Sequence, residues 1–283
     1  MRLKSKTALI TGATGIIGNA IARAFAAEGC DLILSGSSQK KTAALQEQFS
    51  PFPNVKVETI CADVSDKKSV QQLLEKVGRK FQVIDILVTA AAVCGASGST
   101  DQVEPEEWME ALKVNLLGTF MTIKYSLPFL RKSRRGKIIA FSGGGEGALV
   151  NRSSYVSSKG GVLRLVETLA SELAPIDINA IAPGLVVSGL LDGLIKAGPD
   201  RLGKEGYEQA LKQKKGEAES FPPEIAASLA VFLASPESDG ISGKNLSAVR
   251  DKWRDFPKHK KELIKSDVYN IRRIKPKDRN YDW

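Results

Sequence analysis

The sequence predicts an α/β fold in which a doubly wound parallel sheet carries helices on both faces. Short apolar runs alternate with segments of helical apolar spacing, and a glycine-rich turn joins the first run to the first helical segment. With 283 residues, 42% of them hydrophobic, the chain can bury a sizeable core. We therefore expect a single domain over residues 1–249 and an extension over residues 250–283.

The first elements follow this alternation closely. Residues 7–10 form a short apolar run, and residues 16–27 carry apolar side chains at helical spacing. Residues 32–34 form a second apolar run, followed by a polar helical pattern around residues 43–49. Residues 55–61 alternate between polar and apolar side chains, as a half-buried strand does. Two strand–helix units and a third strand are therefore expected in the first quarter of the chain.

The rest of the domain repeats the same two patterns. The long helical stretch is expected to kink near Gly118, because glycine weakens a helix. We expect strands at 83–88, 138–141 and 176–181, and helices at 69–81, at 106–131 and from Tyr155 to about residue 173.

The turn after the first strand reads Thr11-Gly-Ala-Thr-Gly-Ile-Ile-Gly18. Glycines let the backbone approach a pyrophosphate, whose charge is met by the amides at the helix N-terminus. The motif lies between a strand and a helix, which is the context a dinucleotide site requires. The sequence therefore predicts a dinucleotide site here, against the alternative of an ordinary tight turn.

Tyr155 and Lys159 lie four residues apart on an expected helix and share one of its faces. An ammonium beside a phenol favours the phenolate, so we expect Lys159 to lower the pKa of Tyr155 from about 10. A lowered pKa suits a general acid that works near neutral pH. Ser142 follows an apolar run and should lie at the carboxyl end of a strand, where its hydroxyl could polarise a substrate oxygen. Alone, such a pair is more often a solvated helix face.

The composition indicates in which cellular compartment the protein works and which kinds of site it lacks. No apolar run approaches the roughly 18 residues of a membrane span, and the N-terminus leaves no room for a signal peptide. Cys30, Cys61 and Cys94 are scattered and fit neither a disulfide framework nor a zinc site, which indicates a reducing, cytoplasmic setting. The single histidine, His259, has no metal-binding companions, so no metal site is expected.

The formal net charge is +9, and the segment from Arg250 to Trp283 holds twelve Lys/Arg against six Asp/Glu. A basic segment can face an acidic partner, a phosphorylated substrate or nucleic acid. This one mixes charge signs and carries apolar anchors such as Trp253 and Phe256, which a nucleic-acid-binding tail does not need. We expect it to pack on a neighbouring subunit or to edge the site.

Taken together, these motifs resemble the short-chain dehydrogenase/reductase family, in its compact single-domain branch, from about Lys6 to Ser247. The thirteen-residue gap between Ser142 and Tyr155 also fits. The resemblance rests on the turn at 11–18, Asp63-Val64, Asn115 in Val-Asn-Leu-Leu-Gly118, Ser142, Tyr155 with Lys159, and Ala182-Pro-Gly184.

The resemblance implies a Rossmann-type fold, hydride transfer between a nicotinamide and an alcohol or carbonyl carbon, and a homo-oligomer, a dimer or a tetramer. It makes Tyr155 the acid/base, Lys159 its partner and a ribose ligand, Ser142 the holder of the substrate oxygen, and Asn115 the support of a proton relay. The cofactor-binding residues it implies are Gly12, Thr14, Gly15, Ile16, Ile17, Gly18, Ser35, Ser37, Ser38, Asp63, Val64, Ala90, Ala91, Tyr155, Lys159, Pro183 and Gly184.

Two features depart from the family pattern. Ile16 stands where the compact branch usually has its second glycine, and the spacing Gly12, Gly15, Gly18 is more typical of the branch with nucleotide-sugar epimerases and dehydratases. Residues 89–92 read Thr-Ala-Ala-Ala in place of Asn-Asn-Ala-Gly. An epimerase or dehydratase is therefore one alternative, although the larger C-terminal substrate domain expected of that branch is missing.

Cofactor choice depends on the end of the second strand, where an acid would bind the ribose 2′-hydroxyl of NAD. The sequence there offers Ser37 and Ser38 with Lys40 or Lys41 nearby, while Asp31 lies at the wrong end of the strand. These residues favour a 2′-phosphate and hence NADP, with NAD as the alternative.

Residues 185–221 form the expected substrate lid, since glycines punctuate this segment and its apolar side chains follow directly on Pro183-Gly184. We expect an oxidoreductase that uses NADP(H) on a 3-oxoacyl thioester, a sugar or polyol, or a small ketone. The alternative from another class is a cofactor-binding regulator or nucleic-acid-binding protein. An intact Ser142–Tyr155–Lys159 set argues against it, because a sensor has no use for a tuned phenol.

Overall fold

A computed structural model describes residues 1–143 and 147–282. Its sheet has seven parallel strands in the order β3-β2-β1-β4-β5-β6-β7. The order reverses between β1 and β4, which are adjacent, and ligands bind at such a switch point in doubly wound folds. The strands are β1 (Thr7–Thr11), β2 (Asp31–Gly36), β3 (Val57–Cys61), β4 (Ile86–Thr89), β5 (Lys137–Phe141), β6 (Asp177–Ala182) and β7 (Asn245–Ser247).

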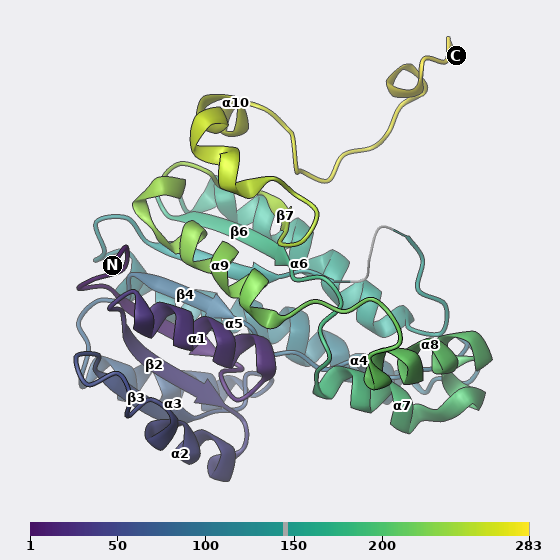
Figure 1. The fold of residues 1–283 in the computed structure, drawn as a ribbon, viewed down its shortest axis with the longest axis horizontal. Coiled ribbons are helices and arrows are strands. Elements are labelled where there is room, and N and C mark those ends of the chain that lie inside the picture. Colours follow the sequence, from purple (N-terminus) through teal and green to yellow (C-terminus); the bar gives the residue numbers. More distant parts are fainter. Residues whose placement is uncertain (144–146, 283) are drawn as a thin grey trace.

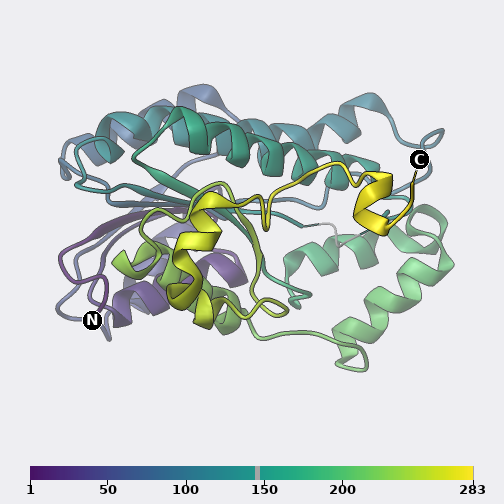
Figure 2. The same cartoon turned by 90° about the horizontal axis from the view of Figure 1, so that it is seen from above.

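Helices cover both faces of the sheet in three layers, which Figure 2 shows edge-on. One layer holds α1 (Ile16–Ala27) and α9 (Pro223–Ala234), which pack on each other. The opposite layer holds α3 (Lys67–Gly78), α5 (Gly118–Leu130) and α6 (Ser153–Glu172), and α2 (Gln39–Gln48) packs beside β2 and β3. The predicted fold is confirmed.

Two cores result, one on each face of the sheet. Phe25 of α1 and Phe232 of α9 are buried in the first core, and Leu73 of α3 and Val166 of α6 in the second. Side chains alternate between the faces of a strand, so Ile10 of β1 lies in the first core while its neighbour Leu9 lies in the second. Burial of apolar side chains on both faces holds the edge that carries the glycine turn in place.

The long helical stretch expected at 106–131 is interrupted. It consists of α4 (Pro105–Ala111), a π-helical segment η1 (Leu112–Leu117), and α5, which begins at Gly118. The kink expected near Gly118 is therefore a π-helical insertion that ends one residue before it. A Cβ on Gly118 would approach the Cγ2 of Val64 to 2.8 Å, so the glycine allows the helix to pass close to the segment after β3.

The segment after β6 forms two helices, α7 (Gly189–Leu202) and α8 (Lys204–Lys215), at the end of the molecule that Figure 1 shows on the right. Gly198 interrupts α7 with a φ of 78°, at the Gly-Pro break seen in the sequence. Leu191, Leu194 and Leu202 form a small core of their own together with Ala210. The expected lid is thus a helical pair with its own packing.

The C-terminal extension packs first against its own chain. Trp253 and Phe256 lie in the first core, each with its ring near that of Phe232, and Leu263 of α10 (Lys260–Lys265) joins them. Tyr269 still packs on Phe256, and the Asn270 side chain donates to the carbonyl of Gly243. The last part of the extension runs away from the body in Figure 1, and Ile274 and Tyr281 are exposed there. The anchors that we expected on a neighbouring subunit or beside the site are therefore partly used within the chain. Trp283 lies outside the described residues.

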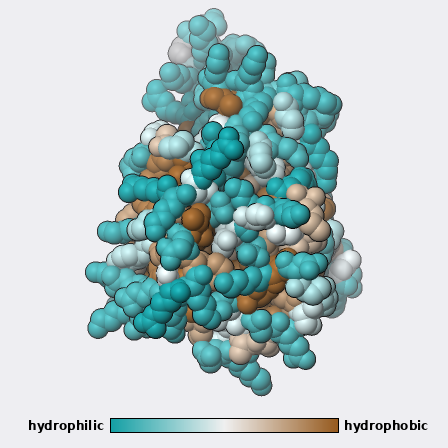
Figure 3. Space-filling view, turned by 90° about the vertical axis from the view of Figure 1, so that its left-hand side faces the viewer, coloured by the Kyte–Doolittle hydropathy of each residue, from teal (hydrophilic) through white to brown (hydrophobic). Residues whose placement is uncertain are grey.

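The outer surface is mostly hydrophilic on the side that faces left in Figure 1, where Figure 3 shows only small, separate groups of hydrophobic side chains. No helix in the described part of the chain is both long and apolar enough to cross a membrane.

Candidate active site

Three consecutive residues at the end of β5 gather the predicted catalytic groups. The carbonyl of Phe141 accepts a hydrogen bond from the Nζ of Lys159 at 2.9 Å. Ser142 follows, with its amide bonded to the carbonyl of Ile181 on β6. A Cβ on Gly143 would lie 2.5 Å from the Tyr155 hydroxyl, so that hydroxyl lies directly against the Gly143 backbone. Ser142, Tyr155 and Lys159 thus form one cluster at the carboxyl edge of the sheet.

All three side chains of the cluster are largely buried. The Ser142 hydroxyl donates to the Oδ1 of Asn245 on β7 at 2.8 Å, which fixes its rotamer. The sequence offered no signal for Asn245, because nothing in the Gly-Lys-Asn-Leu run shows that β7 pairs with β6 beside β5. A hydroxyl held in this way can orient a substrate oxygen.

The pKa values differ from the expectation. Burial raises the pKa of Tyr155, and the nearby charge of Arg152 opposes this rise only in part. Burial lowers the pKa of Lys159 to about 8. The predicted lowering of the Tyr155 pKa by Lys159 is therefore wrong for this structure. The reason is that removing the phenol from water disfavours the phenolate, and Lys159 is not among the charges that act on it.

Asn115 lies in η1 and is buried. Its side-chain amide donates to the carbonyl of Val93 at 3.0 Å and to the Oγ of Ser158 at 2.9 Å, and its Oδ1 accepts from the amide of Val93 at 2.9 Å. Asn115 therefore ties the segment after β4 to α6. Its predicted part in a proton relay stays a prediction, and the structure gives it a positioning contact.

The glycine turn forms one wall of the adjoining groove. Gly12 has a φ of 70°, and a Cβ there would lie 2.5 Å from the amide nitrogen of Ala91, so only glycine fits between β1 and the segment after β4. The amide of Gly15 closes the turn on the Gly12 carbonyl at 3.0 Å. α1 begins at the next residue, with no acidic side chain in its first turn and no side-chain cap. Its N-terminal amides are thus suited to an anion such as a pyrophosphate.

The groove beside this turn has a volume of about 400 Å³. Asp63 and Val64 line it, as do Glu110 and Lys113 of the helical stretch after β4. Eight of the predicted cofactor-binding residues line it together: Gly12, Thr14, Gly15, Ser37, Asp63, Val64, Ala90 and Ala91. Its shape, lining and helix N-terminus fit a dinucleotide.

The other predicted cofactor-binding residues lie around this groove in different ways. Ser35 is fully buried in β2, where its carbonyl accepts from the amide of Ala13 and supports the turn from behind. Ser38 caps α2 by accepting from the amide of Lys41. Ile17 is packed against the first core, and Gly18 is buried beneath the turn. Pro183 and Gly184 follow β6.

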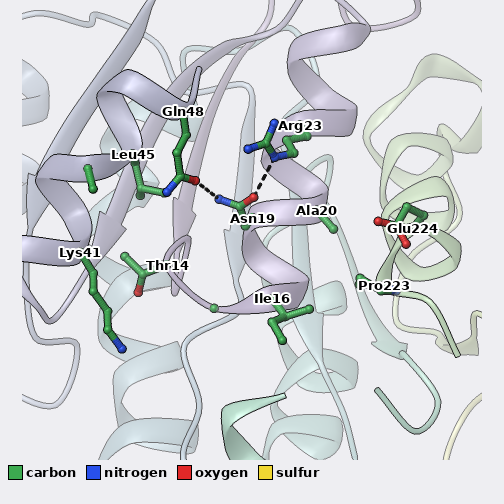
Figure 4. A pocket seen from close by; sticks show the side chains of 12 residues that line it. Thr14, Ile16, Asn19, Ala20, Arg23, Lys41, Leu45, Gln48, Pro223 and Glu224 are labelled. Carbon is green, nitrogen blue, oxygen red and sulfur yellow. Dashed lines mark hydrogen bonds between the residues drawn. The ribbon is translucent and has the colours of Figure 1, made fainter. Parts of the chain in front are cut away.

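A second pocket of about 450 Å³ lies between α1 and α2 on the outer side of the same turn (Figure 4). Thr14 lines both this pocket and the groove, so the two are neighbours. Lys41 of α2 and Ile16 of α1 line the outer pocket, and Ile16 is 45% exposed. A lysine is therefore at hand beside the turn. Ile16, which lines this outer pocket, occupies the sequence position where the compact branch usually has glycine.

Two residues that the sequence did not single out also belong to the cluster. Arg152 stacks on the Tyr155 ring, with its Cζ 4.9 Å from the ring centroid. Cys94 is close enough to affect the pKa of both Arg152 and Tyr155. The spacing of three between Arg152 and Tyr155 on one helix was the only available signal for the first. Within the described residues, no group of His, Cys, Asp and Glu could hold a metal ion.

Comparisons with known proteins agree with this geometry. A family model described as short chain dehydrogenase matches residues 6–197. A 3-oxoacyl-acyl-carrier-protein reductase of Thermotoga maritima is 31% identical over 251 residues, which cover 86% of this chain and 96% of the relative. A D-beta-hydroxybutyrate dehydrogenase of Cupriavidus necator is 32% identical over 250 residues, covering 85% and 95%. The solved structure of an NAD⁺-bound xylitol dehydrogenase has a TM-score of 0.78 at 25% identity, covering 87% and 98%.

The matched region contains the glycine turn, the groove and the Ser142–Tyr155–Lys159 cluster, and the chain spans nearly the full length of these relatives. The cluster and the groove lie at the same edge of one sheet, as a hydride-transfer site requires. The chain therefore belongs to the short-chain dehydrogenase family and is an NAD(P)-dependent oxidoreductase that acts on CH–OH or C=O groups.

Proposed function

We propose that this protein is a cytoplasmic, NADP(H)-dependent carbonyl reductase or secondary-alcohol dehydrogenase. One observation carries the proposal: residues 141–143 hold Lys159, Ser142 and Tyr155 in a single cluster next to a groove suited to a dinucleotide. The dinucleotide, when bound, supplies or accepts the hydride. A spectrophotometric panel of ketones, oxo acids, 3-oxoacyl thioesters and sugars with NADPH tests it, and no turnover of any of them would contradict it.

The residues of the cluster would divide the work during carbonyl reduction. The Ser142 hydroxyl, oriented by Asn245, holds the carbonyl oxygen. The Tyr155 hydroxyl donates its proton to that oxygen as negative charge develops on it. The raised pKa of Tyr155 keeps the phenol protonated near neutral pH, which suits the acid required in the reducing direction. Lys159 holds positive charge behind the cluster and anchors its Nζ on Phe141.

Three substrate classes fit this chemistry: 3-oxoacyl thioesters, sugars or polyols, and small ketones. The relatives named above include a 3-oxoacyl-acyl-carrier-protein reductase and a xylitol dehydrogenase, which correspond to the first two classes. The D-beta-hydroxybutyrate dehydrogenase adds a hydroxy acid. An epimerase or dehydratase is less well supported, because the chain spans 96% of a compact reductase. A nucleic-acid-binding role is also less well supported, because Trp253 and Phe256 of the extension are buried in the core.

NADP preference rests on Ser37 in the groove and on Lys41 beside the turn. We expect higher kcat/KM with NADPH than with NADH. The variant Lys41→Ala should raise the KM for NADPH about tenfold and leave that for NADH unchanged, because a charged hydrogen bond to a phosphate contributes on the order of 1.5 kcal/mol. Lys132→Ala, at the amino edge of the sheet, is the matched control. A wild-type preference for NADH would overturn the assignment.

We also propose a homo-oligomer that uses the apolar groove between η1, α5 and α6. This groove has a volume of about 370 Å³ and is lined almost wholly by apolar side chains, of which Leu117 and Phe120 are exposed. The variant Leu117→Asp should reduce the native mass toward the 30.5 kDa of one chain, as measured by light scattering. Ile274→Asp, on the last part of the extension, tests the competing interface: dissociation by this variant alone would assign the contact to the extension.

A further inference from the structure

Arg152 is the residue that caps the start of α6, three positions before Tyr155. Its guanidinium lies over the Tyr155 ring, and the side chain is half-buried. Both of its chain neighbours are held by hydrogen bonds: the carbonyl of Asn151 accepts from the amide of Gly98, and the Ser153 hydroxyl accepts from the indole nitrogen of Trp108. The guanidinium is therefore held over the ring that carries the reactive hydroxyl.

Within the described part of the chain, the Arg152 side chain makes no hydrogen bond. The Nε of Arg152 is buried without a partner, and no residue that the structure describes accepts a hydrogen bond from the guanidinium. Other arginines of this protein are well paired: Arg201 donates to Ser97 and Glu107, and Arg135 to Asp177. Buried donors in proteins nearly always have partners, so an unpaired one requires an explanation.

The charge of Arg152 is also unbalanced. Burial lowers its pKa, and among the residues that the structure describes the ionisable groups that act on it are Tyr155 and Cys94. Burial raises the pKa of the Cys94 thiol, so Cys94 stays neutral and offers no negative charge at neutral pH. No carboxylate of the described residues acts on Arg152. An isolated cation beside the phenol is costly unless an anion joins it.

The lid packs on the segment after β4 that carries Cys94, one of the groups that act on Arg152. A Cβ on Gly193 of α7 would lie 2.7 Å from the Sγ of Cys94, and Arg201 of α7 ties the lid to the carbonyl of Ser97 at 2.7 Å. Cys94 and Val187 pack against the lid core around Leu191 and Leu194. The cation and the phenol are thus polar groups next to apolar side chains, and few polar features are available to select a substrate.

We propose that Arg152 binds the carboxylate of the substrate, and that the substrate is a short oxo- or hydroxycarboxylate with its carboxylate one or two carbons from the reacting carbon. This proposal rests on the proposed function and names the substrate class for it. A guanidinium presents paired N–H donors that match the two oxygens of a carboxylate. A single half-buried cation suits one negative charge better than the two of a phosphate. The stacked geometry requires the charged group and the reacting carbonyl to be close neighbours in one small molecule.

The carboxylate takes no part in bond changes. During reduction, the carbonyl carbon gains a hydride from the reduced dinucleotide and the oxygen gains a proton from Tyr155, so that C=O becomes CH–OH and the dinucleotide is oxidised. The carboxylate stays ionised against Arg152 throughout and orients the carbonyl toward Tyr155. Arg152 therefore determines specificity and is not the proton donor.

Matched pairs of 2-, 3- and 4-oxo carboxylates and their methyl esters test the assignment with NADPH. The acid of at least one pair should have a kcat/KM roughly tenfold to a hundredfold above that of its ester, because the ester cannot form the charge-assisted bond. Arg152→Gln should remove this preference by slowing the acid alone. Arg152→Lys keeps the positive charge but loses the paired N–H donors of the guanidinium, so it should retain part of the preference for the acid. Arg164→Gln, which removes an exposed arginine farther along the same helix, is the control and should keep the preference.

A wild-type enzyme that reduces the esters as well as the acids, or an Arg152→Gln variant that keeps the preference for the acid, would overturn the proposal. Failure of the proposed function has a different signature, namely no turnover of acids, esters or any other carbonyl. In that event, the effect of malonate on the melting temperature shows whether Arg152 binds a carboxylate. Stabilisation by malonate in the wild type and in Arg164→Gln, but not in Arg152→Gln, supports the anion site, and no difference between the variants contradicts it.

Discussion

Tyr155→Phe is expected to lower kcat by about 10²–10⁴-fold, which is the usual contribution of a positioned general acid. The variant keeps the aromatic ring, and with it the packing under Arg152, but loses the hydroxyl that lies against Gly143. Binding of NADPH should remain within about twofold of wild type, because the groove is lined by other residues. Steady-state kinetics and fluorescence titration of the bound dinucleotide measure the two quantities separately.

The matched control is Tyr125→Phe on α5, which removes the same atom from a side chain packed on the second core. It should leave kcat unchanged. A Tyr155→Phe enzyme with nearly full activity would remove the phenol from the reaction and would favour a binding protein over an enzyme. Loss of both activity and dinucleotide binding would instead indicate damage to the fold.

Lys159→Met is expected to abolish most of the activity and at the same time to stabilise the protein near neutral pH. Lys159 is almost fully buried, its one hydrogen bond to a described residue runs to Phe141, and burial lowers its pKa to about 8 from 10.5. Below pH 8 the folded protein therefore carries a buried charge that the unfolded chain holds in water. At 1.36 kcal/mol per pKa unit the penalty is on the order of 3 kcal/mol, partly offset by the lost hydrogen bond to Phe141.

The sign of the pH dependence follows from the lowered pKa. The penalty is fully present below the folded pKa of about 8 and disappears as the pH rises toward 10.5, where the lysine is neutral in both states. The stability advantage of Lys159→Met over wild type should thus shrink by roughly 3 kcal/mol between pH 7 and pH 10. Urea unfolding at several pH values measures it. Lys124→Met, which removes an exposed lysine from α5, should show no such trend.

An advantage of Lys159→Met that does not change with pH would mean that the ammonium carries no burial penalty. In kinetic terms, kcat should fall by roughly 10²-fold or more. Such a combination, a more stable but inactive protein, is the mark of a residue retained for function at a cost in stability.

Local patterns were enough to predict most of the elements. The helix expected at 16–27 has these same bounds, and the strands at 7–10 and 138–141 each differ by one residue. All three elements follow from the periodicity of apolar residues along the chain, which can be read from the sequence without knowing the tertiary contacts. The kink near Gly118 was also expected, but its form was not, because the π-helical insertion at η1 is stabilised by Asn115 bonding to Val93, a contact across 22 residues.

In the site, too, local spacing predicted some features, and long-range contacts decided others. Motif spacing predicted Ser142, Tyr155 and Lys159, and they meet at the end of β5. The pKa of Tyr155 was predicted with the wrong sign, because spacing reports the charge of a neighbour but not the loss of water around the phenol. Asn245, Arg152 and Cys94 join the cluster through strand pairing, ring stacking and lid packing.

By itself, the sequence determined the α/β architecture and the family, and it predicted the acid/base group, because these depend on residue type and on spacing along one strand or helix. Only the tertiary structure decided which groups are desolvated, which donors are left without a partner, and that Trp253, Phe256 and Leu263 of the basic extension belong to the core. Each of these depends on residues far apart in the chain, since burial and pairing are properties of what packs against a side chain.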